Sequence, residues 1–514
     1  MMWNPDVSSL KSTLLMSRIW TFESPALTRS SPAVPPHSLS PEFPVIRILL
    51  STVSLLLFVL AARLPAEVRF PSVIGDNMVL QRGEPVPVWG WDTPGTVVSV
   101  SLGDHTARAT AGEDGRWTAY LPAQKAGGPH EIGVKGTSEV TIKNVLVGEV
   151  WFCSGQSNME WRVRQSKDAE KEIAAAKHPR IRHIKFPHRP ADNPQSNIAS
   201  DGWKACSPET VGEFTAVGYF FGRYLQEQLD VPIGLLGCNW GGTRIEPWIP
   251  PAGFRGVPKL SEISASLDKY PARRGNGQVN HQSPLALYNG MVAPVLPYGV
   301  RGALWYQGES NNGEGMMYYE KMKALINGWR SVWQKPSLPF YFVQLAPYRY
   351  GGDPTRLAGI WEAQLKTLSV PHTGMAVIVD IGNTRDIHPR NKQDVGKRLA
   401  LWALAGTYGK KDLVYSGPLY KSMKIKGSTI RLEFNHVGGG LVSRDSKPLS
   451  HFTIAGEDKK FVAATATIEG GSVVVRADGV EKPVAVRLGW HQEAEPNLSN
   501  KAGLPASPFR TDSW

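Results

Sequence analysis

A serine at position 157, within the segment GQSNM, and the pair Asp386 and His388 are the residues best suited to do chemistry together. A serine hydroxyl becomes a nucleophile when a histidine takes its proton, and a nearby carboxylate can hold that histidine in the required tautomer. The combination predicts acyl transfer, with Ser157 as nucleophile, His388 as base and Asp386 as orienting acid.

Each role has a competing explanation. A serine that opens a helix serves equally well as its cap, so the GQSNM motif alone does not separate the two roles. Ser154 and Ser310 are rival nucleophiles, although Ser154 lies in a predicted strand and Ser310 has no base nearby in the sequence. Asp380, at the end of a predicted strand, is the rival orienting acid; its other role would be to cap the loop that carries the site.

Donors for an oxyanion are the next requirement. Gly241 and Gly242, in the segment NWGGT, offer backbone N–H groups with room for a substrate, although a plain tight turn also explains them. The side-chain amides of Gln307 and Asn311, in the segment WYQGESN, are the other candidates. The sequence does not choose between these two amides.

Charged residues near these segments are candidates for substrate binding. Arg244 and Glu309 are proposed for that role, and Arg244 either pairs with Glu246 or binds sugar hydroxyls. For Glu309, a structural role as a buried carboxylate bonded to loop N–H groups is a better explanation than a catalytic role. No metal or other cofactor is expected. There is no glycine-rich phosphate loop, and the candidate histidines are too scattered in the sequence for a zinc site. These histidines are His281, His372, His388 and His491.

The elements that must position these residues alternate between strands and helices. The apolar run at residues 145–152 predicts a strand that ends just before GQSNM, and the polar residues 160–172 are predicted to be helical. Such alternation predicts a mostly parallel sheet with helices on both faces and a site at the carboxyl ends of the strands. Further strands are predicted at 231–238, 302–306, 340–345 and 376–380, and further helices at 211–228, 316–332, 356–368 and 391–405.

The chain of 514 residues predicts two to four domains at roughly 100–200 residues each. Short strand-like runs separated by Gly, Asp and Pro predict a β-sandwich-like domain at 67–145, for packing or carbohydrate contact, and a β-rich region at 411–514. The catalytic α/β domain is expected at 146–410, preceded by a disordered extension at 1–45 and a targeting segment at 46–66.

The targeting segment has an apolar core at 48–60 behind Arg47, followed by small residues that end at Ala66. The core is short for a membrane span, so we expect an export signal and a periplasmic or extracellular protein, with a retained signal anchor as the rival. The Ser- and Pro-rich residues before it need not belong to the natural start of translation.

The net charge is +12 and the pI about 9.4, which mildly favours an acidic sugar. The basic residues are scattered and no nucleic-acid motif occurs, so no nucleic-acid partner is expected. The three cysteines, Cys153, Cys206 and Cys238, form no CxxC or metal-ligand spacing, and their odd number gives no disulfide framework.

In chain order, four segments resemble the sialate O-acetylesterases and related carbohydrate acetylesterases of the SGNH hydrolase superfamily. The resemblance extends from about residue 67 to the end of the chain, because three further segments also match: VLQR at 79–82, GLPA at 503–506 and PFRTD at 508–512. The four segments are EVWFCSGQSNM at 149–159, NWGGT at 239–243, WYQGESN at 305–311 and DIHP at 386–389.

The resemblance implies a flavodoxin-like three-layer α/β/α domain and metal-free removal of O-acetyl groups from sugars. Ser157 would attack the acetyl carbonyl and His388, held by Asp386, would carry the proton. The Ser157 N–H, one of the two glycine N–H groups, and Gln307 or Asn311 would receive the oxyanion. Two blocks depart from the superfamily's common pattern: Gln156 replaces its aspartate, and its Asp-x-x-His is shortened to Asp-x-His.

An acetylated sugar or glycan is therefore the expected substrate, with sialate as the family's name substrate. No membrane partner is expected beyond a possible signal anchor. The alternatives are an acetyl xylan or other polysaccharide O-acetylesterase, an inactive carbohydrate-binding protein, and an SGNH lipase or thioesterase. The intact Ser157, His388 and Asp386 argue against an inactive protein. A lipase would need a long apolar trough, whereas the loops here are rich in Trp, Asn and Gly.

Overall fold

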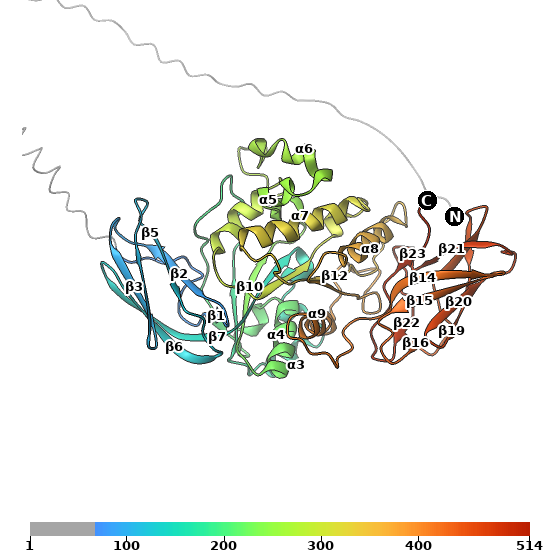
Figure 1. Cartoon of the computed structure of the whole chain (residues 1–514), viewed down its shortest axis with the longest axis horizontal. Helices are drawn as coiled ribbons and strands as arrows, with labels where there is room; N and C mark the ends of the chain where they lie inside the picture. Colours follow the sequence, from blue (N-terminus) through green and yellow to red (C-terminus); the bar gives the residue numbers. More distant parts are fainter. Residues whose placement is uncertain (1–66) are drawn as a thin grey trace, which may run out of the picture. The chain divides into compact units, whose positions relative to one another are not determined.

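The computed structural model describes residues 67–514, which fall within one compact unit (Figure 1). The predicted extension at 1–45 and the targeting segment at 46–66 lie outside the described residues. Across residues 67–514, no helix has the length and apolarity needed to cross a membrane.

A central, mostly parallel sheet occupies the middle of this unit. Its order is β13-β12-β11-β7-β10-β8-β9, and every neighbouring pair is parallel except β8 and β9. The chain leaves β7 toward one edge and later crosses to the other, so the carboxyl end of β7 lies at a topological switch point, where ligands bind in such sheets. The strands are β7 (Glu139–Gly155), β8 (Ile181–Lys185), β9 (Lys204–Ala205), β10 (Ile233–Asn239), β11 (Gly302–Tyr306), β12 (Phe340–Val343) and β13 (Thr373–Ala376).

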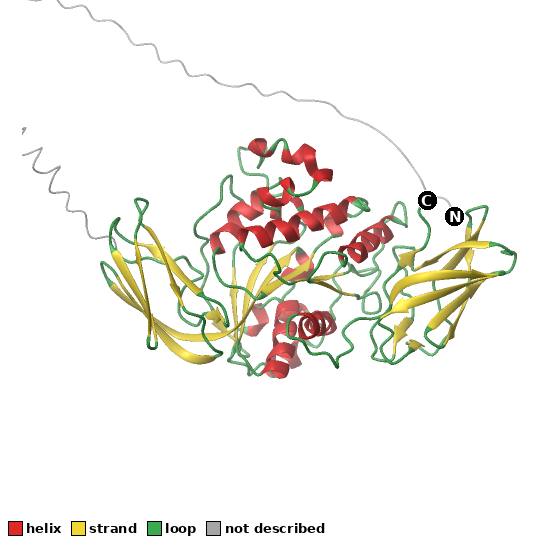
Figure 2. Cartoon of the chain, viewed as in Figure 1, coloured by secondary structure: helices red, strands yellow, loops and turns green. Residues whose placement is uncertain are grey.

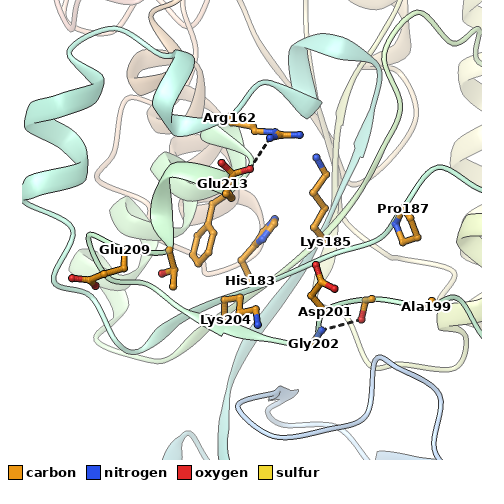
Figure 3. A pocket seen from close by; sticks show the side chains of 13 residues that line it. Arg162, His183, Lys185, Pro187, Ala199, Asp201, Gly202, Lys204, Glu209 and Glu213 are labelled. Atoms are coloured by element: carbon orange, nitrogen blue, oxygen red, sulfur yellow. Dashed lines mark hydrogen bonds and ion pairs between the residues drawn. The ribbon is translucent and has the colours of Figure 1, made fainter.

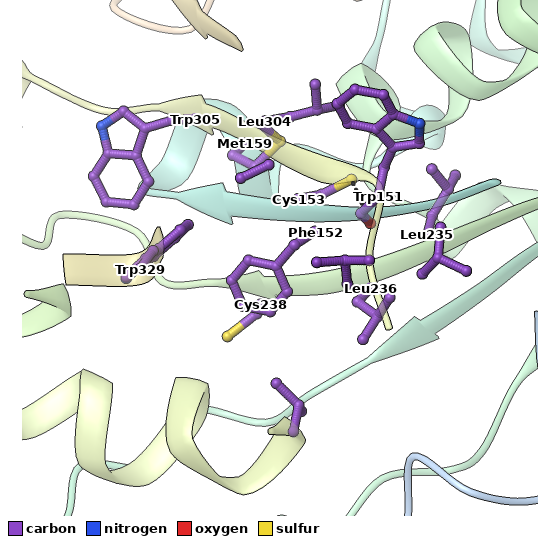
Figure 4. Packing of buried hydrophobic residues seen from close by; sticks show 14 of the residues in the cluster. Trp151, Phe152, Cys153, Met159, Leu235, Leu236, Cys238, Leu304, Trp305 and Trp329 are labelled. Atoms are coloured by element: carbon purple, nitrogen blue, oxygen red, sulfur yellow. Dashed lines mark hydrogen bonds between the residues drawn. The ribbon is translucent and has the colours of Figure 1, made fainter. Parts of the chain in front are cut away.

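Helices cover both faces of this sheet (Figure 2). On β7, Trp151 packs against Phe221 of α4 (Ala216–Leu229), whereas the next residue, Phe152, packs against Trp329 of α7 (Met317–Val332). Figure 4 shows Trp151 and Phe152 on opposite sides of the strand. The apolar run predicted from the sequence is continuous because both of its faces are buried.

The other helices follow the same division. Helix α9 (Lys392–Gly406) packs beside α4, and α5 (Pro251–Arg255) and α8 (Arg356–Thr367) pack beside α7 (Figure 1). The predicted α/β class, with helices on both faces of a mostly parallel sheet, is confirmed.

The prediction of a helix at 160–172 is wrong. The structure has α2 (Ser157–Glu160), a 3-10 turn at Val163–Gln165 and α3 (Ala169–Ala174). Trp161 has extended backbone (ψ 126°) and Asp168 a left-handed conformation (φ 53°), so the chain turns at both positions. Helical propensity is a weak preference, and here the contacts around the site override it.

Before the central sheet lies a region of six strands. Strands β2 and β5 form one sheet. Strands β1 and β6 pair with β7, β3 pairs with β6 and β4 pairs with β3, so β7 runs from this region into the central sheet. The strands are β1 (Val79–Gln81), β2 (Val86–Trp91), β3 (Val97–Leu102), β4 (His105–Thr110), β5 (Arg116–Leu121) and β6 (Gly127–Lys135).

After α9 the chain forms a second β region with its own apolar core. Arg510 is paired with Glu362 of α8 at 2.8 Å, and Gln344 donates to Ser507 at 2.9 Å, so this region is fastened to the α/β part. Its strands are β14 (Leu419–Lys426), β15 (Thr429–Asn435), β16 (Leu441–Ser443), β17 (Phe452–Gly456), β18 (Phe461–Ala463), β19 (Thr465–Glu469), β20 (Ser472–Arg476), β21 (Pro483–Leu488), β22 (Leu498–Asn500) and β23 (Phe509–Arg510).

Candidate active site

Ser157 stands at a sharp turn between β7 and α2. Gly155 has φ +136°, and a Cβ at this position would lie 2.2 Å from the carbonyl oxygen of Tyr306. Only glycine fits there. The N–H of Gln156 donates to the same oxygen at 3.0 Å, and Ser157 then opens α2. The Ser157 N–H donates no hydrogen bond to any of the described residues.

His388 faces this serine from the loop between β13 and α9. Its Nε2 lies 2.8 Å from the Ser157 Oγ, a hydrogen-bond distance that suits removal of the serine proton. The ring stacks on Trp161 with 4.7 Å between centroids and 16° between planes. Ser157 and His388 line a cavity of about 370 Å³ together with Glu160, Trp161, Arg162, Arg164 and Gln165.

Asp386 lies beside His388 without a direct bond to its ring. Its Oδ1 accepts the backbone N–H of His388 at 3.0 Å and is 3.8 Å from the ring Nδ1. The rival, Asp380, forms a two-point ion pair with Arg398 at 2.6 and 2.7 Å. Asp386 is therefore the carboxylate near the histidine, whereas Asp380 anchors its loop to α9.

The buried residues Asn158 and Lys392 and the half-buried Glu309 form a polar cluster behind the serine. The Asn158 Nδ2 donates to Glu309 at 2.6 Å and to the carbonyl oxygen of Ile387 at 3.0 Å, and its Oδ1 accepts from the Lys392 Nζ at 2.5 Å. The Lys392 ammonium lies 5.1 Å from the Tyr306 ring centre. The motif contained Asn158, but nothing in the sequence singled out Lys392.

This cluster sets the electrostatics of the base. Burial is the main cause that lowers the pKa of His388, and the positive charge of Lys392 lowers it further, while Asp386 raises it. Burial also lowers the pKa of Lys392 to about 7, against the opposing effects of Glu309 and Asp386. Burial raises the pKa of Glu309. The environment thus favours a neutral imidazole, the form that can accept a proton.

The glycines of NWGGT lie close to Ser157. A Cβ at Gly241 would be 3.3 Å from the Ser157 Cβ, so the close approach explains the glycine. The Gly241 N–H donates to Glu160 Oε2 at 2.8 Å. The Gly242 N–H has no acceptor among the described residues, and its φ of +73° also suits glycine.

The two candidate side-chain amides are engaged elsewhere. The Gln307 Nε2 donates to the carbonyl of Thr243 at 3.1 Å and to the Asn311 Oδ1 at 2.8 Å. The Asn311 Nδ2 donates to Glu246 at 3.0 Å and to Glu314 at 3.1 Å. With both amide hydrogens used on each side chain, neither has a free donor for an oxyanion in this conformation. These amides join the NWGGT and WYQGESN loops.

Arg244 belongs to an ion-pair network in the same region. It pairs with Glu246 at 2.9 Å, one of the two roles expected for it, and also with Glu314. Lys321 pairs with both carboxylates, at 2.7 and 2.6 Å. The Arg244 side chain is still 39% exposed, so it can also meet a ligand. Glu309, the other candidate for substrate binding, is engaged by Asn158 in the polar cluster.

Neither rival serine has a hydrogen bond to His388 among the described residues. Ser154 is fully buried within β7, and its hydroxyl has no partner among the described residues. Ser310 is held through its backbone, because its N–H donates to Gln156 Oε1 at 3.4 Å.

An aromatic stack that the sequence did not reveal borders the site. Trp240 lies between His188, at 4.5 Å, and His281, at 4.6 Å between ring centroids. His188 bonds Glu160 at 2.8 Å. Burial alone would raise the pKa of Glu160, but His188, Gly241 and Lys185 together hold it below its ordinary value. Within residues 67–514, no group of three His, Cys, Asp or Glu side chains is placed to hold a metal ion.

Comparison with known proteins places this chain in a family. The model of the family described as carbohydrate esterase, sialic acid-specific acetylesterase, matches residues 147–404. The sialate O-acetylesterase of Homo sapiens is 31% identical over 493 residues, which cover 86% of this chain and 92% of the human protein. That of Rattus norvegicus is 33% identical over 421 residues, 70% of this chain and 77% of the rat protein.

A solved structure agrees in fold. The crystal structure of a carbohydrate acetylesterase from Xanthomonas citri has a TM-score of 0.80 and 42% sequence identity, and the match covers 87% of this chain and 100% of that one. From the extent of these matches, the chain belongs to the sialic acid-specific acetylesterase family of carbohydrate esterases.

Proposed function

We propose that this protein is a serine esterase that removes O-acetyl groups from carbohydrates. The observation that carries the proposal is the 2.8 Å separation of the Ser157 Oγ and the His388 Nε2 at the carboxyl edge of the sheet. Membership of a carbohydrate esterase family supports the same chemistry.

In the acylation step, the Ser157 Oγ attacks the acetyl carbonyl carbon while His388 Nε2 accepts the hydroxyl proton. The resulting tetrahedral intermediate collapses as His388 returns that proton to the departing sugar oxygen, which leaves an acetyl group on Ser157. Water, deprotonated by the same histidine, then attacks the acetyl-serine. Acetate leaves and the serine regains its proton.

The N–H groups of Ser157 and Gly242 are our choice for the oxyanion donors, because both lack an acceptor among the described residues. The Gly241 N–H could join them only if Glu160 released it. Asp386 acts through its charge and its bond to the His388 N–H, and a shorter contact with Nδ1 would form as the site tightens around substrate.

Acetylated carbohydrate is the proposed substrate class, since the curated relatives are sialate O-acetylesterases and the solved one is a carbohydrate acetylesterase. Acetate release from 9-O-acetyl sialic acid, acetylated xylan and acetylated simple sugars would identify the preferred sugar. We also propose that the protein is exported, on the basis of the apolar segment at 48–60.

Ser157→Ala tests the mechanism. We expect this variant to keep the parent's thermal stability but to release no acetate from an aryl acetate or an acetylated sugar. Arg164→Ala is a control on the wall of the same cavity, outside the reacting groups. Acetate release by Ser157→Ala at the parent's rate would refute the proposed role of this serine.

A further inference from the structure

A second and larger cavity, of about 640 Å³, lies next to the one at Ser157. Figure 3 shows the side chains that line this larger cavity. Arg162 lines both cavities. Lys185 of the larger cavity also lies 3.7 Å from Glu160 of the smaller one. The two cavities are therefore neighbours that share Arg162 as a lining residue.

The larger cavity is built at the carboxyl end of β8, which supplies His183 and Lys185. Residues 199–204 and the segment that leads into α4 complete its walls, as Figure 3 shows for Asp201, Lys204 and Glu213. Its volume falls within the range of roughly 300–1,000 Å³ that is usual for small-molecule sites.

The charges on its walls are balanced. Glu213 bonds Arg162 at 2.6 Å and also pairs with Arg164 in the smaller cavity. His183 adds no charge, because burial lowers its pKa to about 3. Three basic and three acidic side chains line the space: Arg162, Lys185, Lys204, Asp201, Glu209 and Glu213.

This balance decides the class of ligand. An anionic sugar is favoured by an excess of positive charge, whereas a neutral polyhydroxyl ligand is favoured by many donors and acceptors of both kinds. Phe214 and His183 also line the cavity and stack on each other at 4.6 Å and 25°, but both rings are almost fully buried and offer little surface to a ligand. His183 is only 3% exposed, and its Nε2 has no partner among the described residues.

We propose that the larger cavity is a subsite for a neutral sugar residue next to the O-acetylated one, so that the preferred substrate is an oligosaccharide or polysaccharide rather than a single sugar. This inference rests on the proposed esterase function and names the substrate class for it. A free monosaccharide would occupy only the smaller cavity and would gain nothing from the larger one.

The first test compares substrates of different length and charge. We expect kcat/KM for O-acetylated xylotetraose or cellotetraose to exceed that for the matching O-acetylated monosaccharide and that for 9-O-acetyl sialic acid by about tenfold, which corresponds to one or two hydrogen bonds. Equal values for chains and monosaccharides, or a preference for the sialic acid, would overturn the subsite. Failure of the parent to release acetate from any of them would instead refute the esterase proposal.

The second test fills the cavity. Ala199 is exposed on its wall, so Ala199→Trp is expected to lower the ratio of kcat/KM for the tetrasaccharide to that for 4-nitrophenyl acetate about tenfold. Asp201→Ala, which removes a hydrogen-bonding group without adding bulk, should lower the same ratio about threefold. Ala463→Trp, at an exposed position on β18, is the matched control. An unchanged ratio in both cavity variants would exclude the subsite.

Discussion

The amide nitrogen of Asn158, the residue after the candidate nucleophile, donates to the carbonyl oxygen of Ile387, the residue before the candidate base, at 3.0 Å. One buried side chain therefore ties the turn after β7 to the loop after β13, although the two residues are 229 positions apart. The contact between Ser157 and His388 depends on the placement of both backbones. Asn158 links the two backbones through a side-chain hydrogen bond.

Replacing Asn158 with alanine should lower kcat by about 10- to 100-fold, because a small misplacement of a reacting group is enough to cause such a loss. Its Lys392 and Glu309 partners would be left unpaired, so we also expect a loss of about 1–3 kcal/mol in the free energy of unfolding. Rates with an aryl acetate and denaturant titration measure the two effects. Asn276→Ala, on an exposed loop, is the control. A kcat within twofold of the parent would show that the link is dispensable.

Gly155→Ala should destabilise the protein by about 2–5 kcal/mol, since the new Cβ would meet the Tyr306 carbonyl and the residue would keep a strained positive φ. The turn that presents Ser157 would shift with it, so activity should fall as well. The matched control is Gly275→Ala, where nothing lies within 4 Å of the added Cβ. Thermal and denaturant unfolding of both variants would measure the difference. Similar stabilities would refute the steric argument.

Much of the α/β core could be predicted from local patterns. The helix predicted at 316–332 is α7 (Met317–Val332), and the strand predicted at 302–306 is β11 (Gly302–Tyr306), because each has a clear apolar period or run. Strand β8 (Ile181–Lys185) was missed. Its sequence, IRHIK, has polar side chains that are buried only because neighbouring segments cover them. Such burial is a tertiary property that no short window of sequence contains.

The same limit applies to the site. The meeting of Ser157 and His388 could be predicted, because acyl transfer would need these residue types in such segments. Lys392 could not, because a lysine at the start of a helix is ordinarily solvated, and only the packing of Trp161 and Tyr306 around it makes it buried. Gln307 and Asn311 carried the right chemical groups, but their bonding depends on loops that are distant in the sequence.

The two aspartates should respond differently to substitution. Asp386→Ala should reduce kcat about 100-fold, less than a fully bonded triad acid would, because its Oδ1 is 3.8 Å from the histidine Nδ1. Asp380→Ala should instead cost about 3–5 kcal/mol of stability, because Arg398 would remain buried without its partner. Parallel measurements of kcat and unfolding free energy separate these effects. Loss of activity in a stable Asp380→Ala protein would reverse the assignment.

The pH dependence of the reaction should depend on Lys392. The pKa of His388 lies below its ordinary value, mainly through burial and further through the Lys392 charge, so the rate should rise with pH as this histidine loses its proton and level off near neutrality. The Lys392→Met variant lacks the positive charge that lowers the pKa of His388, but it keeps Asp386, which raises that pKa. The pKa of His388 should therefore rise, and the acid limb of the kcat/KM profile should move to higher pH.

The difference should be confined to acidic solution. With a pKa of about 7, Lys392 is mostly charged at a pH of about 5.5 and mostly neutral at about 8.5, so the substitution removes a charge only at the lower pH. The decisive quantity is the ratio of rates at these two pH values, because a merely structural defect would lower both rates together. Lys397→Met removes an exposed lysine from the same helix and should leave the ratio unchanged. A Lys392→Met profile parallel to that of the parent would exclude an electrostatic role for this lysine.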